Sequence, residues 1–326
     1  MITILGPTAS GKTKLAVALA NAVDGEIISA DSRQVYKGMD IGTGKDLADY
    51  RLASGEIVKY HLIDICEAGE KYNLFRYQED FLKAYADIVQ RGKMPVLCGG
   101  TGLYIEAILK QYNLQRVPEN KALRDSLAGK SLEELTEMLE DLKRRTGSNM
   151  HNKTDVDSCK RAIRAIEIEQ YYLENSGAKS DATENQQKVV AENGSFGQDA
   201  LIPGHKPLIF GTDISRELRR QKITHRLDER LKEGMVDEIK GILESGVAPE
   251  DLIYYGLEYK FVTLYLTGEL SYEEMRRQLE IAIHQFAKRQ MTWFRGMEKR
   301  GLHIEWIDYE LPMEQKVQFI LDRIEK

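Results

Sequence analysis

The chain has 326 residues and a formal net charge of −6; 42% of its residues are hydrophobic and 30% are charged. A chain of this length and composition can bury a core, which excludes a disordered protein and predicts one large or two modest globular domains. Its three cysteines, Cys66, Cys98 and Cys159, lie far apart, which excludes a zinc finger or ribbon and favours a reducing compartment.

The N-terminal segment has no basic leader, and nowhere does an apolar run approach the twenty residues of a membrane span. We therefore expect a cytoplasmic protein with no membrane partner. The acidic net charge, taken alone, argues against binding to nucleic acid, because a polyanion needs local positive potential. The local distribution of charge, described below, points the other way.

The first predicted elements are a buried strand at residues 2–5 and a helix at residues 12–23, joined by the sequence GPTASGKT. A strand, Gly-x-x-x-x-Gly-Lys-Thr and a helix form the phosphate-binding loop, in which backbone N–H groups and a helix N-terminus surround an anion. Gly6 and Gly11 allow close approach of the backbone, Lys12 supplies positive charge, and the Thr13 hydroxyl suits Mg²⁺. A plain glycine turn before a helix is the alternative interpretation.

Strands and helices alternate over the first hundred residues, with strands predicted at residues 26–30, 60–65 and 94–98 and a second helix at residues 74–91. This order predicts an α/β fold with a P-loop NTPase-like parallel sheet flanked by helices. Ligands of such sheets bind at the carboxyl ends of the strands. Two further motifs follow strands, namely DSRQ at residues 31–34 and GGTGLY at residues 99–104.

Asp31 and Thr101 are the candidate reactive side chains at these strand ends. The Asp31 carboxylate is either a general base, or an N-cap or a water-mediated Mg²⁺ ligand. Thr101 is either a donor to an anion or a helix-capping threonine. Two glycine-rich strand ends in one sheet favour a larger anion, such as a diphosphate.

Beyond residue 113 the strand pattern gives way to helical periodicity. We expect a helical insertion at residues 113–206 that ends in a long polar loop at residues 174–206. A strand at residues 207–214 then returns to the sheet, and helices continue to the C-terminus. The predicted domains are a core formed by residues 1–112 and 207–326 and the insertion between them.

The helix that begins near residue 215 carries arginines on one face. At 100° per residue, four of its arginines fall within roughly 80° of one another while the acidic residues point elsewhere. These arginines are Arg216, Arg219, Arg226 and Arg230. They predict an anion-facing stripe, and a solvated surface helix is the alternative.

Two further segments, residues 143–164 and 284–300, are locally basic. The second also contains Phe286, Trp293 and Phe294. Cations with interleaved aromatic rings suit a single-stranded or looped RNA, because unstacked bases need aromatic faces and phosphates need positive charge. The alternative is that these rings pack in the core.

Over essentially its whole length the chain resembles the bacterial tRNA dimethylallyltransferases, also called tRNA isopentenyltransferases. The matching pieces occur in the order of that family: GPTASGKT, DSRQVYKGMDIGTGK, YHLIDI, GGTGLY, RAIRAIEI, HRLDERL, TGELSYEEM and QFAKRQMTWFR. The resemblance implies transfer of a dimethylallyl group from dimethylallyl diphosphate to N6 of the adenosine 3′ of the tRNA anticodon, position 37, with release of diphosphate.

The resemblance also implies roles for individual residues. Asp31 would accept the N6 proton, with Thr101 and Arg230 as its catalytic partners at the leaving diphosphate. The diphosphate would be bound by Gly6, Thr8, Ala9, Ser10, Gly11, Lys12, Thr13 and Arg226, with Mg²⁺ as cofactor near Thr13. The tRNA anticodon stem-loop would contact Ser32, Arg33, Gln34, Arg161, Arg164, Gln285, Lys288 and Arg289. We expect a monomer.

Two other activities remain open at this point. The phosphate-binding loop by itself also fits a P-loop kinase or NTPase, and the related adenylate isopentenyltransferases prenylate free adenine nucleotides. The helical insertion and the basic segments favour a macromolecular acceptor over a free nucleotide.

Overall fold

The computed structural model describes residues 1–324 except residues 113, 115, 148–152, 176–201 and 203–206. By its internal contacts the chain divides into a first unit, Met1–Gln111 with His205–Lys326, and a second unit, Tyr112–Gly204. Each unit has a hydrophobic cluster of its own. Among the described residues, no helix combines the length and the apolar character that crossing a membrane requires.

The first unit is built on a six-stranded sheet with the order β3-β2-β4-β1-β5-β6. Its strands are β1 (Ile2–Leu5), β2 (Gly25–Ala30), β3 (Tyr60–His61), β4 (Met94–Gly99), β5 (Leu208–Asp213) and β6 (Glu305–Asp308). All neighbouring pairs are parallel, which confirms the predicted α/β class. The inner strands are buried along almost their whole length because helices cover both faces of a parallel sheet.

The register of the inner strands brings their carboxyl ends level. Leu5 pairs with Gly99 of β4 and with Gly211 of β5, and Ala30 of β2 pairs with Gly99. The segments that follow β1, β2 and β4 therefore leave the sheet side by side. This alignment brings together three motifs that are far apart in the sequence.

Two predictions about strands were wrong. The strand expected at residues 60–65 ends at His61, because Leu62 and Asp64 have φ angles of 63° and 56°, in the left-handed region that no strand accommodates. The C-terminal segment is not wholly helical, since residues 305–308 form β6 beside β5. The strand at residues 305–308 reads EWID, with an acidic residue at each end, and so lacks the predominantly apolar run that marks the equally short strand at residues 2–5.

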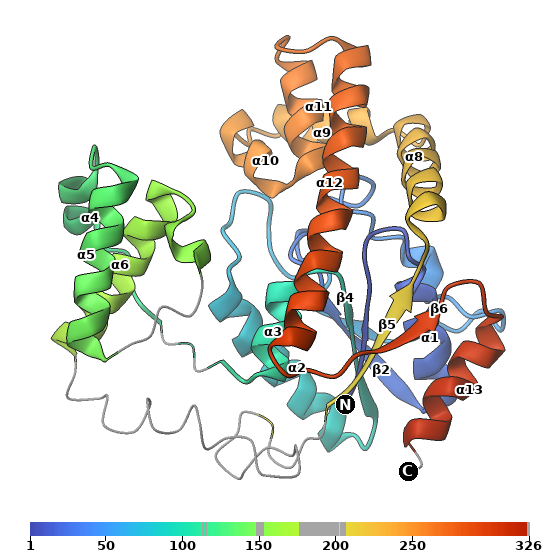
Figure 1. Ribbon diagram of the computed structural model, residues 1–326. Coiled ribbons are helices and arrows are strands. Elements are labelled where there is room, and N and C mark those ends of the chain that lie inside the picture. Colours follow the sequence, from blue (N-terminus) through green and yellow to red (C-terminus); the bar gives the residue numbers. More distant parts are fainter. Residues whose placement is uncertain (113, 115, 148–152, 176–201, 203–206, 325–326) are drawn as a thin grey trace. The chain divides into compact units, whose positions relative to one another are not determined.

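Right-handed crossovers place α1 (Lys12–Ala22) and α2 (Leu74–Gln90) on opposite faces of the sheet, because the chain moves along the sheet in opposite directions in the two connections (Figure 1). The remaining helices of this unit are η1 (Leu47–Tyr50), α3 (Gly102–Leu109), α8 (Arg216–Lys232), α9 (Met235–Glu244), α10 (Pro249–Tyr255), α11 (Leu257–Leu266), α12 (Tyr272–Lys299) and α13 (Met313–Ile324). Helix α13 packs beside α1, whereas α3 packs between α2 and α12.

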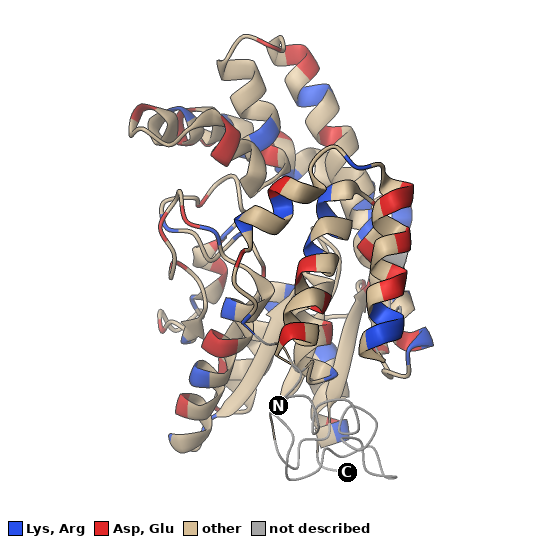
Figure 2. Ribbon diagram, turned by 90° about the vertical axis from the view of Figure 1, so that its left-hand side faces the viewer, with Lys and Arg blue, Asp and Glu red and all other residues tan. Residues whose placement is uncertain are grey.

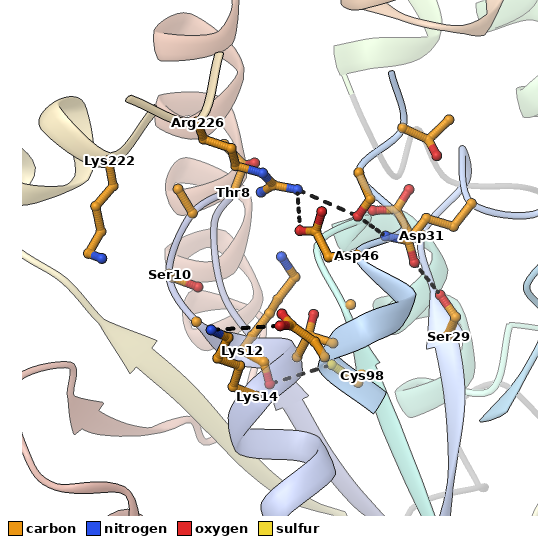
Figure 3. A pocket seen from close by; sticks show the side chains of 18 of the residues that line it. Thr8, Ser10, Lys12, Lys14, Ser29, Asp31, Asp46, Cys98, Lys222 and Arg226 are labelled. Carbon is orange, nitrogen blue, oxygen red and sulfur yellow. Dashed lines mark hydrogen bonds and ion pairs between the residues drawn. The ribbon is translucent and has the colours of Figure 1, made fainter. Parts of the chain in front are cut away.

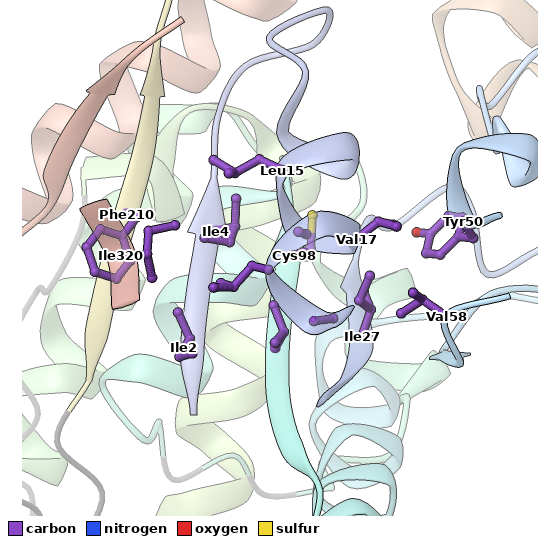
Figure 4. Packing of buried hydrophobic residues seen from close by; sticks show 14 of the residues in the cluster. Ile2, Ile4, Leu15, Val17, Ile27, Tyr50, Val58, Cys98, Phe210 and Ile320 are labelled. Carbon is purple, nitrogen blue, oxygen red and sulfur yellow. The ribbon is translucent and has the colours of Figure 1, made fainter. Parts of the chain in front are cut away.

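The core of the first unit lies between β1, β2, β4, β5 and the helices α1 and α13. Ile2, Ile4 and Ile27 of the strands meet Leu15 of α1 there, and Ile320 of α13 closes the cluster (Figure 4). These side chains are almost completely withdrawn from solvent. Such close packing fixes the strand ends from which the phosphate-binding loop emerges.

The described residues of the second unit form α4 (Lys121–Leu127), α5 (Leu132–Thr146), η2 (Lys153–Val156) and α6 (Cys159–Glu174). Leu135 and Leu139 of α5 pack against Ala162 and Ile166 of α6. Ser131 begins α5 with a capping box, in which Ser131 and Glu134 satisfy each other's backbone amides. The polar loop predicted at residues 174–206 lies almost wholly outside the described residues.

Candidate active site

A cavity of about 360 Å³ opens at the carboxyl ends of β1, β2 and β4 (Figure 3). Its walls include Thr8, Ala9, Ser10, Gly11, Lys12, Thr13, Asp31, Gln34, Asp46, Lys222, His225 and Arg226. A smaller cavity of about 70 Å³ adjoins it and shares Thr8, Lys12, Asp31, Thr43 and Arg226. The smaller cavity adds Ser32, Arg33, Thr101, Arg230, Tyr255, Phe286 and Gln290. The residues predicted from three separate motifs thus surround one site.

The loop between β1 and α1 lines the large cavity, and two of its residues have left-handed backbone angles. Ala9 and Gly11 have φ angles of 61° and 72°, and successive amides in such a conformation form an anion-binding concavity. The Ser10 hydroxyl points away, since it bonds the Thr212 hydroxyl of β5 at 2.7 Å. Gly6 lies behind the loop, where an added Cβ would stand 2.1 Å from Thr212 Oγ1. Ser10 can therefore serve an anion only through its backbone.

Lys12 reaches the cavity from the first turn of α1. Its Nζ lies 3.5 Å from the carbonyl oxygen of Pro7, and burial lowers the pKa of this ammonium. Beneath it, burial raises the pKa of the Cys98 thiol to about 12. The cysteine is therefore neutral, and a bound anion would be the strongest available partner for Lys12.

Asp31 and Thr101 are held close together by the loop after β2. Asp31 Oδ1 accepts a hydrogen bond from the Arg33 amide at 3.0 Å, which fixes the carboxylate in a turn. Thr101 Oγ1 accepts from the Ser32 amide at 3.0 Å and makes no capping bond to α3. Thr101 is the N-cap residue of α3 by position, and its carbonyl accepts from Tyr104 and Ile105, but its side chain does not cap the helix. Its hydroxyl joins the GGTG loop to the Asp31 loop.

Arg226 and Arg230 extend from successive turns of α8 into the two cavities. Their Nη2 atoms lie 3.1 Å and 3.5 Å from the Asp46 carboxylate. Arg230 is only 8% exposed. Burial and the neighbouring Arg230 charge lower the pKa of Arg226 to about 10. A buried and a half-buried guanidinium group lying together form a site for a polyvalent anion.

The predicted arginine stripe is right for these two residues only. Arg216 is exposed and Arg219 is half-buried, and neither lines the two cavities. Lys222 takes the next position on the cavity-facing side of α8. The two cavities are lined only by residues from Lys222 onward in α8, so the arginines at the start of the helix lie away from the site.

Gly44 explains why the arginines can approach so closely. Its φ is 69°, and a Cβ there would lie 1.9 Å from Arg230 Nη2 and 2.2 Å from Arg226 Nη2. No side chain fits between the loop and the two guanidinium groups. Sequence reasoning missed both Gly44 and Asp46, although they lie in or beside the DIGTGK segment.

Gln290 of α12 connects two of the loops at the strand ends. Its Oε1 accepts from the Thr8 amide at 2.9 Å, and its Nε2 donates to the Gly100 carbonyl at 2.8 Å. Gln290 is 7% exposed. Gln285, the glutamine chosen from the sequence, is exposed and lines neither cavity. The helix places them on different faces because they are five residues apart.

The aromatic residues of the second basic segment have separate roles. Phe294 is 0% exposed and belongs to the core, so the packing interpretation holds for it. Trp293 packs on Gly102, where a Cβ would lie 2.3 Å from its ring. Phe286 lines the smaller cavity and Arg289 lies 5.9 Å above its ring. Lys288 and Arg289 are exposed.

Arg33 and Gln34 lie close to the cavities, and their side chains form hydrogen bonds with backbone groups of the protein. Arg33 Nη1 donates to the Tyr255 carbonyl at 2.5 Å, next to Gly256, where a side chain would collide with it. Gln34 Nε2 donates to the Gly44 carbonyl at 3.1 Å. Both side chains therefore support the walls of the site.

In the second unit, Arg161 pairs with Asp157 at 3.0 Å. Arg164 pairs with Glu167 and donates to the Val117 carbonyl at 3.0 Å. Basic and acidic residues alternate along many helices of the protein (Figure 2). The charge of these two arginines is thus partly balanced by neighbours within the unit.

Within the described ranges, no group of three His, Cys, Asp or Glu residues is arranged to hold a metal ion. Thr13, Asp31, Asp46 and Asp49 nevertheless line the large cavity. Mg²⁺ commonly retains water and binds through one or two protein oxygens together with phosphate oxygens. The donor set therefore fits a magnesium ion that arrives with a phosphorylated ligand.

The family model described as IPP transferase matches residues 34–297, and the model described as isopentenyl transferase matches residues 1–55. The chain is 60% identical over 318 residues to tRNA dimethylallyltransferase 1 of Parabacteroides distasonis, covering 97% of this chain and 95% of that protein. It is 59% identical to tRNA dimethylallyltransferase 2 of Phocaeicola vulgatus, with 99% and 96% covered.

Solved structures resemble the protein over nearly its whole length. The tRNA isopentenylpyrophosphate transferase of Bacillus halodurans has a TM-score of 0.66 and 28% identity, with 99% of this chain and 95% of that chain covered. A eukaryotic dimethylallyltransferase acting on tRNA has a TM-score of 0.76 at 24% identity, with 100% and 79% covered. The second likeness concerns the fold alone.

Proposed function

The chain belongs to the IPP transferase family of tRNA dimethylallyltransferases, and on that premise we propose that it modifies N6 of the adenosine 3′ of the anticodon, position 37. Its enzymatic activity is transfer of a dimethylallyl group to tRNA. The donor is dimethylallyl diphosphate, and diphosphate is released. The observation that carries the proposal is the shared wall of the two cavities, where Asp31 stands beside the phosphate-binding loop and Arg226.

The large cavity is the proposed site of the diphosphate. Residues Ala9 to Thr13 of the phosphate-binding loop line it with the Lys12 side chain, and Arg226 lines it as well. The Thr8 amide is already bound by Gln290 Oε1. When the allylic C1–O bond breaks, the electron pair stays with the leaving diphosphate, whose negative charge grows. Preorganised cations stabilise that charge more than they stabilise the bound substrate, and so they lower the barrier.

Asp31 is the proposed general base. N6 of the adenine forms the new bond to C1 and must lose one proton, which the carboxylate accepts. The Arg33 amide holds Oδ1 in place, so the carboxylate needs no reorganisation during the reaction. Thr101, tied to the Ser32 amide, and Arg230 line the smaller cavity, beside the Lys12, Asp31 and Arg226 wall that it shares with the large one. From there they would stabilise the leaving group.

The smaller cavity is the proposed entry for the adenine. Tyr255 and Phe286 supply aromatic surface there, and Ser32 lies beside Asp31. A base that is stacked in free tRNA must be extruded to reach such a recess, at a cost of about a few kcal/mol. Contacts of Arg33, Gln34, Arg161, Arg164, Gln285, Lys288 and Arg289 with the anticodon stem-loop would offset that cost.

Magnesium is the proposed cofactor, held by the Thr13 hydroxyl with the aspartates of the large cavity. A bound Mg²⁺ would neutralise part of the diphosphate charge. We further propose that the enzyme acts as a monomer in the cytoplasm. Because the Cys98 thiol under the loop is neutral, it does not compete with a bound anion for the Lys12 ammonium.

The test is an incubation of the protein with dimethylallyl diphosphate, Mg²⁺ and unmodified tRNA that carries adenosine 3′ of the anticodon. Mass spectrometry of digested nucleosides should detect N6-prenyladenosine, and replacing that adenosine with guanosine should abolish it. Absence of product with every such tRNA would contradict the proposal.

Two further incubations, one with AMP and one with ATP, distinguish this function from the two alternative activities. If AMP were prenylated faster than tRNA, the protein would act as an adenylate isopentenyltransferase. If ATP competed with dimethylallyl diphosphate and were hydrolysed, the kinase or NTPase interpretation would gain. We expect neither.

A further inference from the structure

A single carboxylate on α9 holds three successive backbone amides of the loop that follows the Asp31 motif. Glu238 Oε2 accepts from the amides of Asp40 at 2.9 Å and Ile41 at 2.7 Å. Its Oε1 accepts from the Gly42 amide at 3.0 Å. Consecutive amides converging on one anion form charge-assisted hydrogen bonds, which are stronger than neutral ones.

The contact is reinforced by Tyr259 of α11. Its hydroxyl donates to Glu238 Oε1 at 2.8 Å, and the side chain is 1% exposed. Burial and the adjacent Glu238 charge raise the pKa of Tyr259 far above its ordinary value, so the hydroxyl keeps its proton. A Cβ at Gly42 would lie 2.7 Å from this ring. The loop thus rests directly on α11.

The other end of the loop is fixed by a buried cation. Lys45 donates to the Tyr36 carbonyl at 2.5 Å and to Asp40 Oδ1 at 2.7 Å, and it also pairs with Asp64. Residues 40–45 are therefore held at both ends by charged groups. Between those ends lies Gly44, the residue against which Arg226 and Arg230 pack.

We propose that Glu238 is a positioning residue for the diphosphate site: by holding the amides of residues 40–42 it sets where Gly44 and Asp46 meet Arg226 and Arg230. This inference rests on the proposed function of that site. Glu238 lines neither of the two cavities, so it acts through the loop and not on the ligand. A loop held in place in advance keeps the two guanidinium groups oriented before the anion arrives.

The test compares Glu238→Gln with Asp237→Asn, an exposed residue on the same helix that loses the same charge. Calorimetry measures binding of inorganic pyrophosphate in the presence of Mg²⁺, and hydrogen exchange measures protection of the amides of residues 40–42. For Glu238→Gln we expect about tenfold weaker pyrophosphate binding and faster exchange at those amides, with tRNA affinity unchanged. Asp237→Asn should match the wild type in all three measurements.

Wild-type protein that fails to bind pyrophosphate would overturn the proposed diphosphate site, and the positioning role with it. If the wild type binds and Glu238→Gln binds equally well, only the positioning role is overturned. Equal losses of pyrophosphate and tRNA binding would assign Glu238 a general structural role instead. If circular dichroism shows that Glu238→Gln does not fold, Tyr259→Phe is tested in its place. We expect this variant to bind pyrophosphate about threefold more weakly. Unchanged binding would contradict the positioning role.

Discussion

The side-chain amide of Gln290 donates to the carbonyl oxygen of Gly100 at 2.8 Å, joining helix α12 to the loop that follows β4. The same side chain accepts from the Thr8 amide. One residue of the C-terminal helices therefore sets the spacing between the phosphate-binding loop and the Thr101 loop. One buried and one partly buried backbone group depend on it, and each would lose this partner if the amide were removed.

We expect Gln290→Ala to lower the free energy of unfolding by about 1–3 kcal/mol and to raise the KM for dimethylallyl diphosphate. The reason is that the Thr8 amide and the Gly100 carbonyl lose their partner while the loop loses its fixed position. Urea denaturation and steady-state kinetics measure the two effects. Gln278→Ala, on the same helix and outside the two cavities, is the control. An unchanged KM would show that the loop holds its position without Gln290.

Asp31→Asn should reduce the rate of prenyl transfer by about 10²–10⁴-fold and leave pyrophosphate binding nearly intact, because an amide cannot accept the N6 proton. Single-turnover assays and calorimetry separate the two quantities. Asp24→Asn is the matched control, since Asp24 precedes the other end of the same strand and its side chain is 80% exposed. An active Asp31→Asn enzyme would remove the general-base assignment.

Arg230→Ala should slow the chemical step about 10²–10³-fold, because a desolvated cation that faces the leaving diphosphate stabilises the transition state more than the ground state. Rapid-quench measurement of the first turnover is the appropriate assay. Arg216→Ala, an exposed arginine at the start of the same helix, should react at the wild-type rate. Equal rates in the two variants would place Arg230 outside the reaction.

Glu26 should make the stability of the protein fall in acid. It is buried at the start of β2, where it accepts from Arg91 and meets His61 Nε2 at 2.7 Å. The Arg91 hydrogen bonds lower the pKa of Glu26 from 4.5 to about 2. A depressed pKa in the folded state contributes stability that is present above pH 4.5 and is lost as pH falls toward 2.

The size of this effect is at most about 3–4 kcal/mol, since the shift from 4.5 to about 2 spans about 2.5 pKa units and one unit corresponds to about 1.4 kcal/mol. Urea denaturation measures the free energy of unfolding at pH 7 and at pH 3. The difference between these two free energies should be smaller for Glu26→Gln than for the wild type. Glu56→Gln, at an exposed position, should behave like the wild type. A Glu26→Gln protein with the wild-type pH dependence would contradict the assignment.

Much of the candidate site could be predicted from the sequence because many of its residues belong to short local motifs. A strand, a glycine-rich loop and a helix specify Lys12 and Thr13, and the end of the next strand specifies Asp31. Helical spacing was enough to find Arg226 and Arg230 on one face. The parallel sheet then brings these groups together, and its alternation of strands and helices is also visible in the sequence.

The features that were missed depend on contacts between distant segments. Gln290 meets Thr8 across almost the whole chain, and Glu238 meets residues 40–42 from another helix. The sequence pattern does not distinguish Gln290 or Glu238 from their neighbours, because each lies on an ordinary amphipathic helix. Gly44 could have been suspected as the second glycine of DIGTGK, but the arginines that require it come from α8.

The sheet is completed by strands from both sides of the inserted second unit. Ile2 of β1 pairs with Leu208 of β5, and β6 pairs with β5 in turn. On the ribosome, β1 emerges early but must wait for the entire insertion before its second neighbour is made. Until then one edge of β1 carries unpaired backbone groups. The phosphate-binding loop gains its contact with Thr212 only after β5 is made, and its contact with Gln290 only after α12 is made.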